Sequence, residues 1–209
     1  MKLIFIAGSW CSGTTAVIGA IHSLGVPTFG PLFSTLDSRT PNSYELVAFR
    51  ELVLNFVDEA TTQHKQSYQA EFEPALKRFR QYLEGIEWPD QPDNSEKVFV
   101  LKMPLASVCL PEICRTFDTK VIVVHRPYQE IEASRVRRDW SPIFGIKGAN
   151  LIYNRIFSDL IAHKLCFLGI SYHDFINNTG QTLQNIIDFC EISGFHENFD
   201  KARSFIRSP

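Results

Sequence analysis

The sequence lacks several features that would assign it at once to a class of protein. None of its apolar runs approaches the roughly 20 residues of a membrane-spanning helix, and the first run is too short for a signal peptide. The formal net charge is only −2, which argues against a protein that coats nucleic acid or a charged membrane surface. We therefore expect a cytoplasmic protein with no membrane span and no nucleic-acid partner.

The cysteines also lack the pattern of a bonded or metal-binding set. They form no C-x-x-C pair, and they are scattered along the chain at Cys11, Cys109, Cys114, Cys166 and Cys190. An odd, scattered set favours free thiols in a reducing compartment. Repeats and low-complexity segments are absent as well. The 209 residues are expected to form a single domain, with a helical insertion around residues 41–96.

The start of the sequence contains a phosphate-binding pattern. A short apolar run leads into a loop of Gly8, Ser9, Trp10, Cys11, Ser12, Gly13, Thr14 and Thr15. The spacing is that of a P-loop, G-x-x-x-x-G-K-[ST], except that Thr14 replaces the lysine. Loop amides and the hydroxyls of Thr14 and Thr15 are expected to bind a phosphate-like anion. The alternative interpretation is a glycine-rich turn that binds nothing.

Apolar runs alternate with helical patterns along the rest of the chain. Strands are expected at Leu3–Ala7, Val98–Leu101, Val121–Val124 and Gly169–Ser171. Helices are expected at Thr14–Leu24, Tyr44–Glu59, Gln66–Leu83, Leu105–Thr116, Tyr128–Arg138, Asn150–Leu168 and Thr182–Ser193, and a loop at Asp90–Glu96. Continuous apolar strands between helices indicate an α/β fold. We expect a P-loop-like three-layer sandwich with a central, mostly parallel sheet and helices on both faces.

Polar residues follow the middle strands, where such a sheet binds its ligands. Lys102 comes directly after one strand, and His125 and Arg126 come directly after the next. A P-loop kinase or ATPase holds Mg²⁺ with an acidic residue at such a strand end, and neither of these strands has one. The expected site is therefore cationic and metal-free. The alternative for Lys102 is a solvated lysine at the end of a strand.

Arg126 begins a second anion-binding pattern. Ser134 lies eight residues later, about two helical turns into the next helix, so the two side chains can share one phosphate. The alternative is an arginine paired with Glu130 or Asp139. Further positive charge is concentrated nearby, at Arg135, Arg137 and Arg138.

Taken in order, these motifs resemble those of sulfotransferases that use 3′-phosphoadenosine 5′-phosphosulfate (PAPS). In that family the S-G-T-T loop, here Ser12–Thr15, binds the 5′-phosphosulfate, and the arginine–serine element, here Arg126 and Ser134, binds the 3′-phosphate. Asn42–Glu45 and Tyr172–Phe175 are similar to two more segments of its bacterial branch. The resemblance implies transfer of sulfonate, without a metal, to a hydroxyl or amine. It also implies a small-molecule, glycan or lipid acceptor, and 3′-phosphoadenosine 5′-phosphate (PAP) as the product.

The resemblance also implies catalytic roles. Cys11 stands where the family usually has a basic residue that stabilises charge on the bridging oxygen, and Lys102 is expected to replace it. Glu45 is expected to be the base, and the alternative is a glutamate that helps to cap a helix. His125 is the second candidate base on the residues alone, because it borders Arg126, and the alternative is a structural histidine at the end of a buried strand. Phe29, Phe33, Trp140 and Phe144 are candidates for the wall of an acceptor pocket, and the alternative is that these aromatic side chains pack in the core.

Two other functions remain open on the residues alone. A P-loop nucleotide kinase would use the same loop, although the missing lysine and the missing Mg²⁺ carboxylate count against it. A non-catalytic protein that binds PAPS or PAP would explain why Cys11 replaces the basic residue.

Overall fold

A four-stranded parallel sheet forms the centre of the computed structural model, which describes residues 1–35, 37, 42–88, 97–192 and 198–206. Its strands are β1 (Lys2–Ala7), β4 (Val98–Lys102), β5 (Asp118–His125) and β6 (Phe167–Ser171), in the order β4-β1-β5-β6. Lys2 pairs with Val98 on one side and with Asp118 on the other. Every residue of β1 is buried, because a central parallel strand is covered on both faces.

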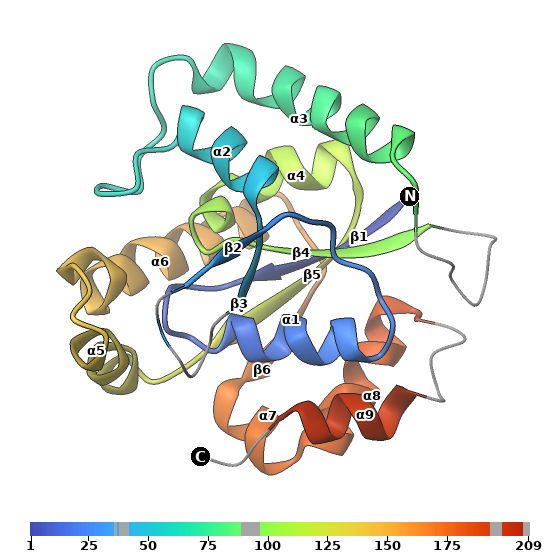
Figure 1. Cartoon of the computed structure of the whole chain (residues 1–209). Coiled ribbons are helices and arrows are strands. Elements are labelled where there is room, and N and C mark those ends of the chain that lie inside the picture. Colours follow the sequence, from blue (N-terminus) through green and yellow to red (C-terminus); the bar gives the residue numbers. More distant parts are fainter. Residues whose placement is uncertain (36, 38–41, 89–96, 193–197, 207–209) are drawn as a thin grey trace.

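Helices cover both faces of the sheet (Figure 1). One face is covered by α2 (Val47–Phe56), α3 (Tyr68–Gly85), α4 (Leu110–Thr116) and α6 (Ile146–Ala162). The other is covered by α1 (Thr14–Ser23), α7 (Tyr172–Asn177), α8 (Thr179–Cys190) and α9 (Phe199–Phe205). Smaller elements are α5 (Tyr128–Arg137), two 3₁₀ turns, η1 (Leu105–Cys109) and η2 (Pro142–Phe144), and an antiparallel pair, β2 (Leu32–Ser34) and β3 (Asn42–Leu46). The predicted three-layer α/β sandwich is confirmed.

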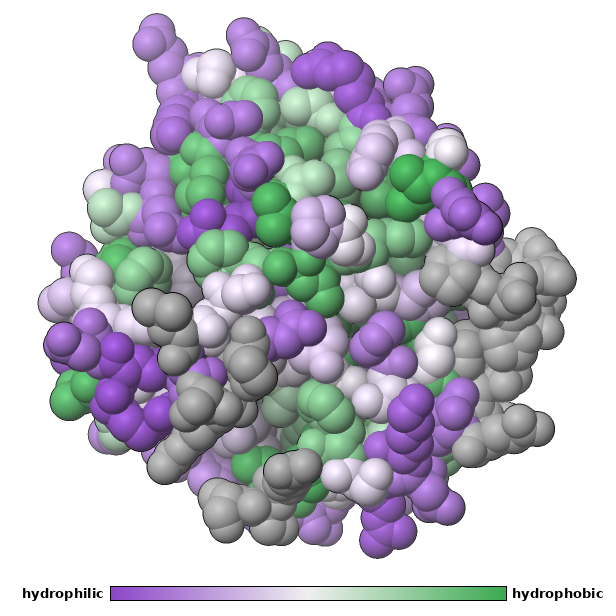
Figure 2. All heavy atoms as spheres, in the orientation of Figure 1, coloured by the Kyte–Doolittle hydropathy of each residue, from purple (hydrophilic) through white to green (hydrophobic). Residues whose placement is uncertain are grey.

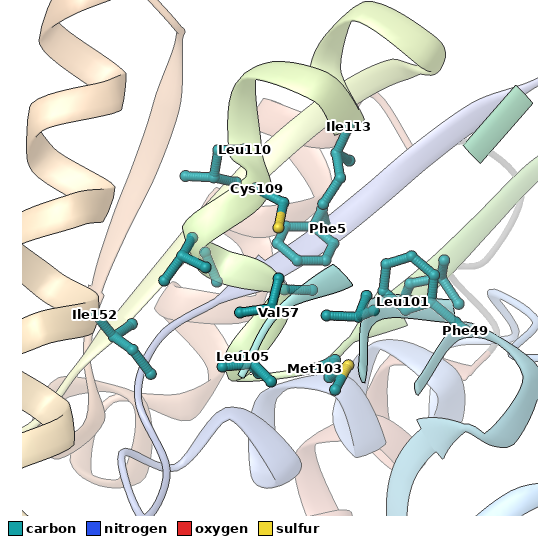
Figure 3. Packing of buried hydrophobic residues seen from close by; sticks show 14 of the residues in the cluster. Phe5, Phe49, Val57, Leu101, Met103, Leu105, Cys109, Leu110, Ile113 and Ile152 are labelled. Carbon is teal, nitrogen blue, oxygen red and sulfur yellow. The ribbon is translucent and has the colours of Figure 1, made fainter. Parts of the chain in front are cut away.

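The two faces of the sheet bury two hydrophobic clusters, because successive strand residues point to opposite sides. Phe5 of β1 belongs to the larger cluster, and its neighbour Ile4 belongs to the smaller one. Figure 3 shows Phe5 lying beside Cys109 and Ile113, with Leu101 of the adjacent strand nearby. Side chains of α2 and α3 belong to the same larger cluster. The helices of the segment around residues 41–96 therefore pack into the main core.

The exposed side of α3 is hydrophilic, and its buried side is not. Phe72, Leu76 and Phe79 lie on the buried side, three or four residues apart, which is the period of an amphipathic helix. Figure 2 shows hydrophilic side chains along the upper edge of the molecule, where α3 lies. Among the described residues, no helix combines the length and the apolar character needed to cross a bilayer.

The predicted helix Tyr44–Glu59 is wrong at its start. Residues Asn42–Leu46 form strand β3, which pairs with β2, and the helix begins only at Val47. Tyr44 has a φ of 58°, outside the helical region. Pairing with a strand upstream is a tertiary contact, so the helical spacing of the apolar residues did not reveal it. The consequence is that Glu45 lies on a strand.

Other predicted boundaries shift for similar reasons. The predicted helix Asn150–Leu168 instead spans Ile146–Ala162, because the residues from Phe167 onward pair with β5 as strand β6. The predicted helix Leu105–Thr116 is divided into η1 and α4, and the predicted helix Thr182–Ser193 is α8. The short helices α7 and α9 were not predicted. The predicted loop Asp90–Glu96 lies outside the described residues.

A close backbone contact fixes α6 against η2, and the Trp10 ring of the loop that follows β1 packs beside it. A Cβ atom at Gly148 would lie 1.8 Å from the carbonyl oxygen of Ile143 in η2, and 3.0 Å from the ring of Trp10. Only a residue without a side chain allows this approach. Gly148 therefore helps to determine where the loop and η2 lie relative to one another.

We expect Gly148→Ala to lower the melting temperature, although alanine favours a helix over glycine by about 1 kcal/mol. The added methyl group overlaps backbone atoms, and overpacking of this kind typically costs about 1–3 kcal/mol of unfolding free energy. Gly85→Ala is the matched control, because a Cβ atom added to this residue at the end of α3 would meet no atom within 4 Å. Thermal unfolding followed by circular dichroism tests the pair. Equal melting temperatures for the two variants would contradict the close contact.

Candidate functional site

A cavity of about 400 Å³ lies at the carboxyl ends of the parallel strands. The loop after β1 lines it with Cys11, Gly13, Thr14 and Thr15, and β4 contributes Lys102. Helix α5 and the segment before it contribute Ser134 and Arg126, and β3 contributes Glu45. Segments from the first half and the second half of the chain thus meet in one cavity, as the position of ligand sites in parallel sheets predicts.

The loop after β1 is held by contacts to its own backbone and to η1. Ser12 Oγ donates to the carbonyl oxygen of Ser9 at 2.7 Å, and Ser9 Oγ donates to that of Trp10 at 3.1 Å. Both serines are fully buried, so their hydroxyls shape the loop. The Gly8 amide donates to Ser107 Oγ at 3.1 Å. Sequence reasoning did not find Ser107, because nothing in the η1 sequence indicates a contact with the loop.

Each glycine of the loop allows a close approach. A Cβ atom at Gly8 would lie 2.8 Å from the carbonyl oxygen of Val124 on β5. Gly13 has a φ of 97°, and a Cβ atom there would lie 2.1 Å from the Tyr172 ring. Thr14 and Thr15 line the cavity as the first two residues of α1, and amides at this end of a helix have no intrahelical acceptor. The helix terminus therefore offers hydrogen-bond donors for an anion.

Arg126 is held from three directions. Its Nε donates to Glu130 Oε2 at 2.9 Å, and its Nη1 donates to the carbonyl oxygen of Cys11 at 3.4 Å. The guanidinium carbon lies 4.6 Å from the centre of the Tyr172 ring. The hydrogen bonds from Arg126 and from His173 hold the pKa of the Glu130 carboxyl below its usual value. The ion pair considered as the alternative for Arg126 thus exists, and the same guanidinium also lines the cavity.

Lys102 belongs to a chain of ion pairs along one side of the cavity. Its side chain is 4% exposed, and its Nζ donates to Glu45 Oε1 at 2.9 Å. Arg50 Nε lies 3.8 Å from the other oxygen of Glu45, and Arg50 Nη2 donates to Glu59 Oε1 at 3.1 Å. Helix α2 begins after Leu46 without a side-chain cap, so Glu45 does not cap it. Sequence reasoning did not find Arg50, which lies on α2, and Glu59, which lies after it, as residues that line the cavity.

His125 is placed differently from the other candidates. Its side chain is exposed at the end of β5, and it is not among the described residues that line the cavity. The aromatic residues predicted to line an acceptor pocket also differ in position: three of them belong to the described cavity wall and one does not. Phe33, Trp140 and Phe144 line the cavity, and Trp10 joins them with its ring 4.9 Å from that of Phe144. Phe29 is a core residue, with its ring 4.9 Å from that of Trp88.

The arginine cluster on and after α5 divides between the cavity and the surroundings. Arg138 lines the cavity, with its Nη1 3.4 Å from Cys11 Sγ. Arg135 donates from Nε to Glu132 Oε1 at 3.0 Å, and Arg137 Nη2 lies 3.4 Å from Asp37 Oδ2. Within the described ranges, no three histidine, cysteine or acidic side chains are grouped as metal ligands.

Known proteins with a similar sequence profile or fold include sulfotransferases. The sequence profile of the sulfotransferase family matches residues 4–197. The solved structure of sulfotransferase STF9 from Mycobacterium avium is 14% identical, with a TM-score of 0.51 over 97% of this chain and 67% of that one. The sulfotransferase domain from the curacin biosynthetic pathway is 16% identical, with a TM-score of 0.56 over 96% of this chain and 77% of that one. No curated protein sequence gives a significant match.

The matched region begins in β1 and ends after α8. It contains every described residue that lines the cavity, from Trp10 to Tyr172. The two solved sulfotransferases share the fold over nearly the whole chain. Because the family profile covers both the central sheet and the complete described wall of the cavity, this chain belongs to the sulfotransferase family.

Proposed function

We propose that the protein transfers a sulfonate group from PAPS to a hydroxyl or amine group of an acceptor, leaving PAP. The observation that carries the proposal is that the loop of residues 8–15 after β1 (the anion loop), Arg126 and the Lys102–Glu45 pair line one cavity. Donor and acceptor must meet at the sulfur atom, so groups that hold the donor and groups that activate the acceptor have to share a cavity. The sulfotransferase family match supports sulfonyl transfer in general.

The hydrogen-bond donors that line the cavity fit a nucleotide with anionic groups at both ends. Thr14 and Thr15 offer hydroxyls and helix N-terminal amides for one anionic group. Arg126 and Ser134 offer a guanidinium and a hydroxyl for the other, and a guanidinium can make paired, charge-assisted hydrogen bonds to phosphate. A cavity of about 400 Å³ is within the range of small-molecule sites.

Glu45 and Lys102 would divide the chemistry between them. Glu45 accepts the proton of the acceptor hydroxyl or amine while the acceptor atom bonds to sulfur. The bond between sulfur and the bridging oxygen breaks, and its electron pair stays on the 5′-phosphate of PAP. Lys102 and the loop amides stabilise this additional negative charge, and such contacts raise the rate because they strengthen in the transition state. His125, exposed and outside the described cavity wall, is the weaker candidate for the base.

The 3′-phosphate role of Arg126 can be tested by calorimetry. Arg126→Ala should weaken PAP binding about ten- to a hundredfold, because a hydrogen bond to a charged group contributes about 1.5–3 kcal/mol. The same variant should bind 5′-AMP, which has no 3′-phosphate, nearly as well as wild type does. Arg135→Ala is the control, since Arg135 lies on α5, the helix that follows Arg126, and is paired with Glu132. Unchanged PAP affinity in folded Arg126→Ala would contradict the role, and tighter binding of ATP–Mg²⁺ than of PAP would favour a nucleotide kinase.

Gly13 should tolerate no side chain. Gly13→Val is expected to abolish PAP binding and to lower stability by about 1–3 kcal/mol, because the residue has a φ of 97° and its Cβ would overlap the Tyr172 ring. Tyr172→Ala removes the overlap with the ring, so it separates the effect of that overlap from the effect of the valine on the bound anion. If Gly13→Val in the Tyr172→Ala background binds PAP as well as Tyr172→Ala alone, the glycine serves packing and not the anion.

Glu45 and Lys102 should affect turnover far more than binding. Glu45→Gln is expected to slow single-turnover sulfonate transfer about a hundred- to ten-thousandfold, the usual contribution of a positioned base. Lys102→Met is expected to slow it about a hundred- to a thousandfold, and both variants should bind PAP within a few-fold of wild type. Glu59→Gln is the control, since it neutralises another carboxylate of the same ion-pair chain. Equal rates for Glu45→Gln and Glu59→Gln would exclude Glu45 as the base.

An acceptor screen precedes these rate measurements. Wild-type protein that binds PAP but transfers sulfonate to none of a set of phenols, sterols, sugars and amines would favour the non-catalytic PAP-binding protein. The absence of a basic residue at Cys11 is the observation that keeps this second function under test.

A further inference from the structure

Arg138 places a second guanidinium against the loop, at the end of α5. Its Nη1 donates to Cys11 Sγ at 3.4 Å, and its guanidinium carbon lies 4.7 Å from the centre of the Trp140 ring. Its Nε donates to Asp37 Oδ2. The Arg138 side chain is 13% exposed, and that of Asp37 is 8% exposed. Contacts to separate segments therefore fix a largely buried charge beside the anion loop.

The two guanidiniums at the loop approach Cys11 through different atoms. Arg126 contacts its carbonyl oxygen, and Arg138 contacts its sulfur. Both arginines line the cavity together with Thr14 and Thr15. Their carboxylate partners, Glu130 and Asp37, are not among the described residues of the cavity wall. Each ion pair thus orients a guanidinium that forms part of the wall.

Lys102 and Arg50 differ from these arginines in where their partners lie. Glu45 and Glu59, which pair with them, line the cavity themselves. That side of the cavity combines both signs of charge, whereas the loop side presents guanidiniums. A ligand with two anionic groups would match two guanidiniums that contact Cys11 through different atoms, because each can bind an oxyanion through a planar pair of donors.

We propose that Arg138 is a second anion ligand of the cavity. It binds the 5′ end of the nucleotide donor, while Arg126 binds the 3′-phosphate. This inference rests on the proposed function. When the bond between sulfur and the bridging oxygen breaks, the electron pair remains on the 5′-phosphate, and Arg138 stabilises that charge from its position beside Cys11. Asp37 and Trp140 are positioning residues, because they contact Arg138 and hold its guanidinium at the loop.

Calorimetry with three nucleotides distinguishes the roles of the two arginines. PAP carries both a 3′-phosphate and a 5′-phosphate. Adenosine 3′-phosphate carries only the 3′-phosphate, and 5′-AMP carries only the 5′-phosphate. Arg138→Met should weaken PAP and 5′-AMP binding about ten- to a hundredfold and leave adenosine 3′-phosphate binding within about twofold. Arg126→Ala should show the opposite preference between the two monophosphates.

Arg137→Met is the matched control. Arg137 precedes Arg138, also pairs with Asp37, at 3.4 Å, and is more exposed, at 38% of its side chain. It is not among the described residues that line the cavity. Both variants remove one positive charge from the same end of α5, so a general electrostatic effect would weaken binding equally. We expect Arg137→Met to bind all three nucleotides within about twofold of wild type.

Charge rescue gives a second readout. Arg138→Met should slow single-turnover transfer about a hundred- to a thousandfold, as loss of one preorganised donor does. Adding Cys11→Lys to Arg138→Met returns a cation to the same place from the loop side, and should recover at least about tenfold of both the rate and the 5′-AMP affinity. In wild type the same lysine would meet Arg138, so Cys11→Lys alone should give no gain. A purely structural Arg138 would not be rescued in this way.

The outcomes distinguish a failure of the proposed function from a failure of the role proposed for Arg138. Wild-type protein that fails to bind PAP overturns the proposed function and the role of Arg138 together. Wild type that binds PAP, with Arg138→Met binding 5′-AMP equally well, overturns the role of Arg138 alone. Should Arg138→Met unfold, Arg138→Lys keeps the charge but loses the planar donor pair, and it should weaken 5′-AMP binding at least about threefold. If Arg138→Lys binds 5′-AMP with wild-type affinity, paired recognition of the phosphate by the guanidinium is contradicted.

Discussion

The tight turn from β1 into α1 is the feature on which the rest of the cavity depends. Gly8 lies where a side chain would come within 2.8 Å of the β5 backbone, and Gly13 lies under the Tyr172 ring. The loop also receives hydrogen bonds or contacts from η1, α5 and α6. Because its position is fixed from several sides, the start of α1 and the cations around Cys11 keep a defined geometry. Preorganised donors of this kind favour binding of an anion without a large reorganisation.

The protein concentrates positive charge locally although its formal net charge is −2. Four cationic side chains, those of Arg50, Lys102, Arg126 and Arg138, line the cavity within the described ranges. Each has a carboxylate partner, which offsets part of the cost of partial burial. On the loop side these carboxylates, Glu130 and Asp37, are not among the described residues that line the cavity. On the β3 side Glu45 and Glu59 line the cavity themselves, so the two sides of the cavity differ in charge.

The residues that sequence reasoning missed share one property. Arg50, Glu59, Ser107 and Arg138 reach the cavity or its loop through contacts between segments far apart in the chain. Arg138 was named in the sequence as part of a cluster of positive charge suited to an anion site, but its neighbours Arg135 and Arg137 look the same there. The helix predicted at Tyr44–Glu59 hid strand β3, because an apolar pattern reports local periodicity and not pairing with a distant strand. Glu45 therefore appeared as a possible helix cap, although its carboxylate contacts Lys102.

Local patterns of residues were enough to predict the α/β class, the parallel sheet and the edge of the sheet where the cavity lies. Apolar strands without alternation, the glycines of the first loop and the polar residues after β4 and β5 are local signals with direct physical causes. Which charged groups pair was decided only by the tertiary structure. The tertiary structure also placed Phe29 in the core, away from the aromatic side chains of the cavity. It left His125 exposed and outside the described cavity wall. Periodicity and turn chemistry act over a few residues, whereas a cavity collects side chains from the whole chain, and their distances exist only once the segments have packed together.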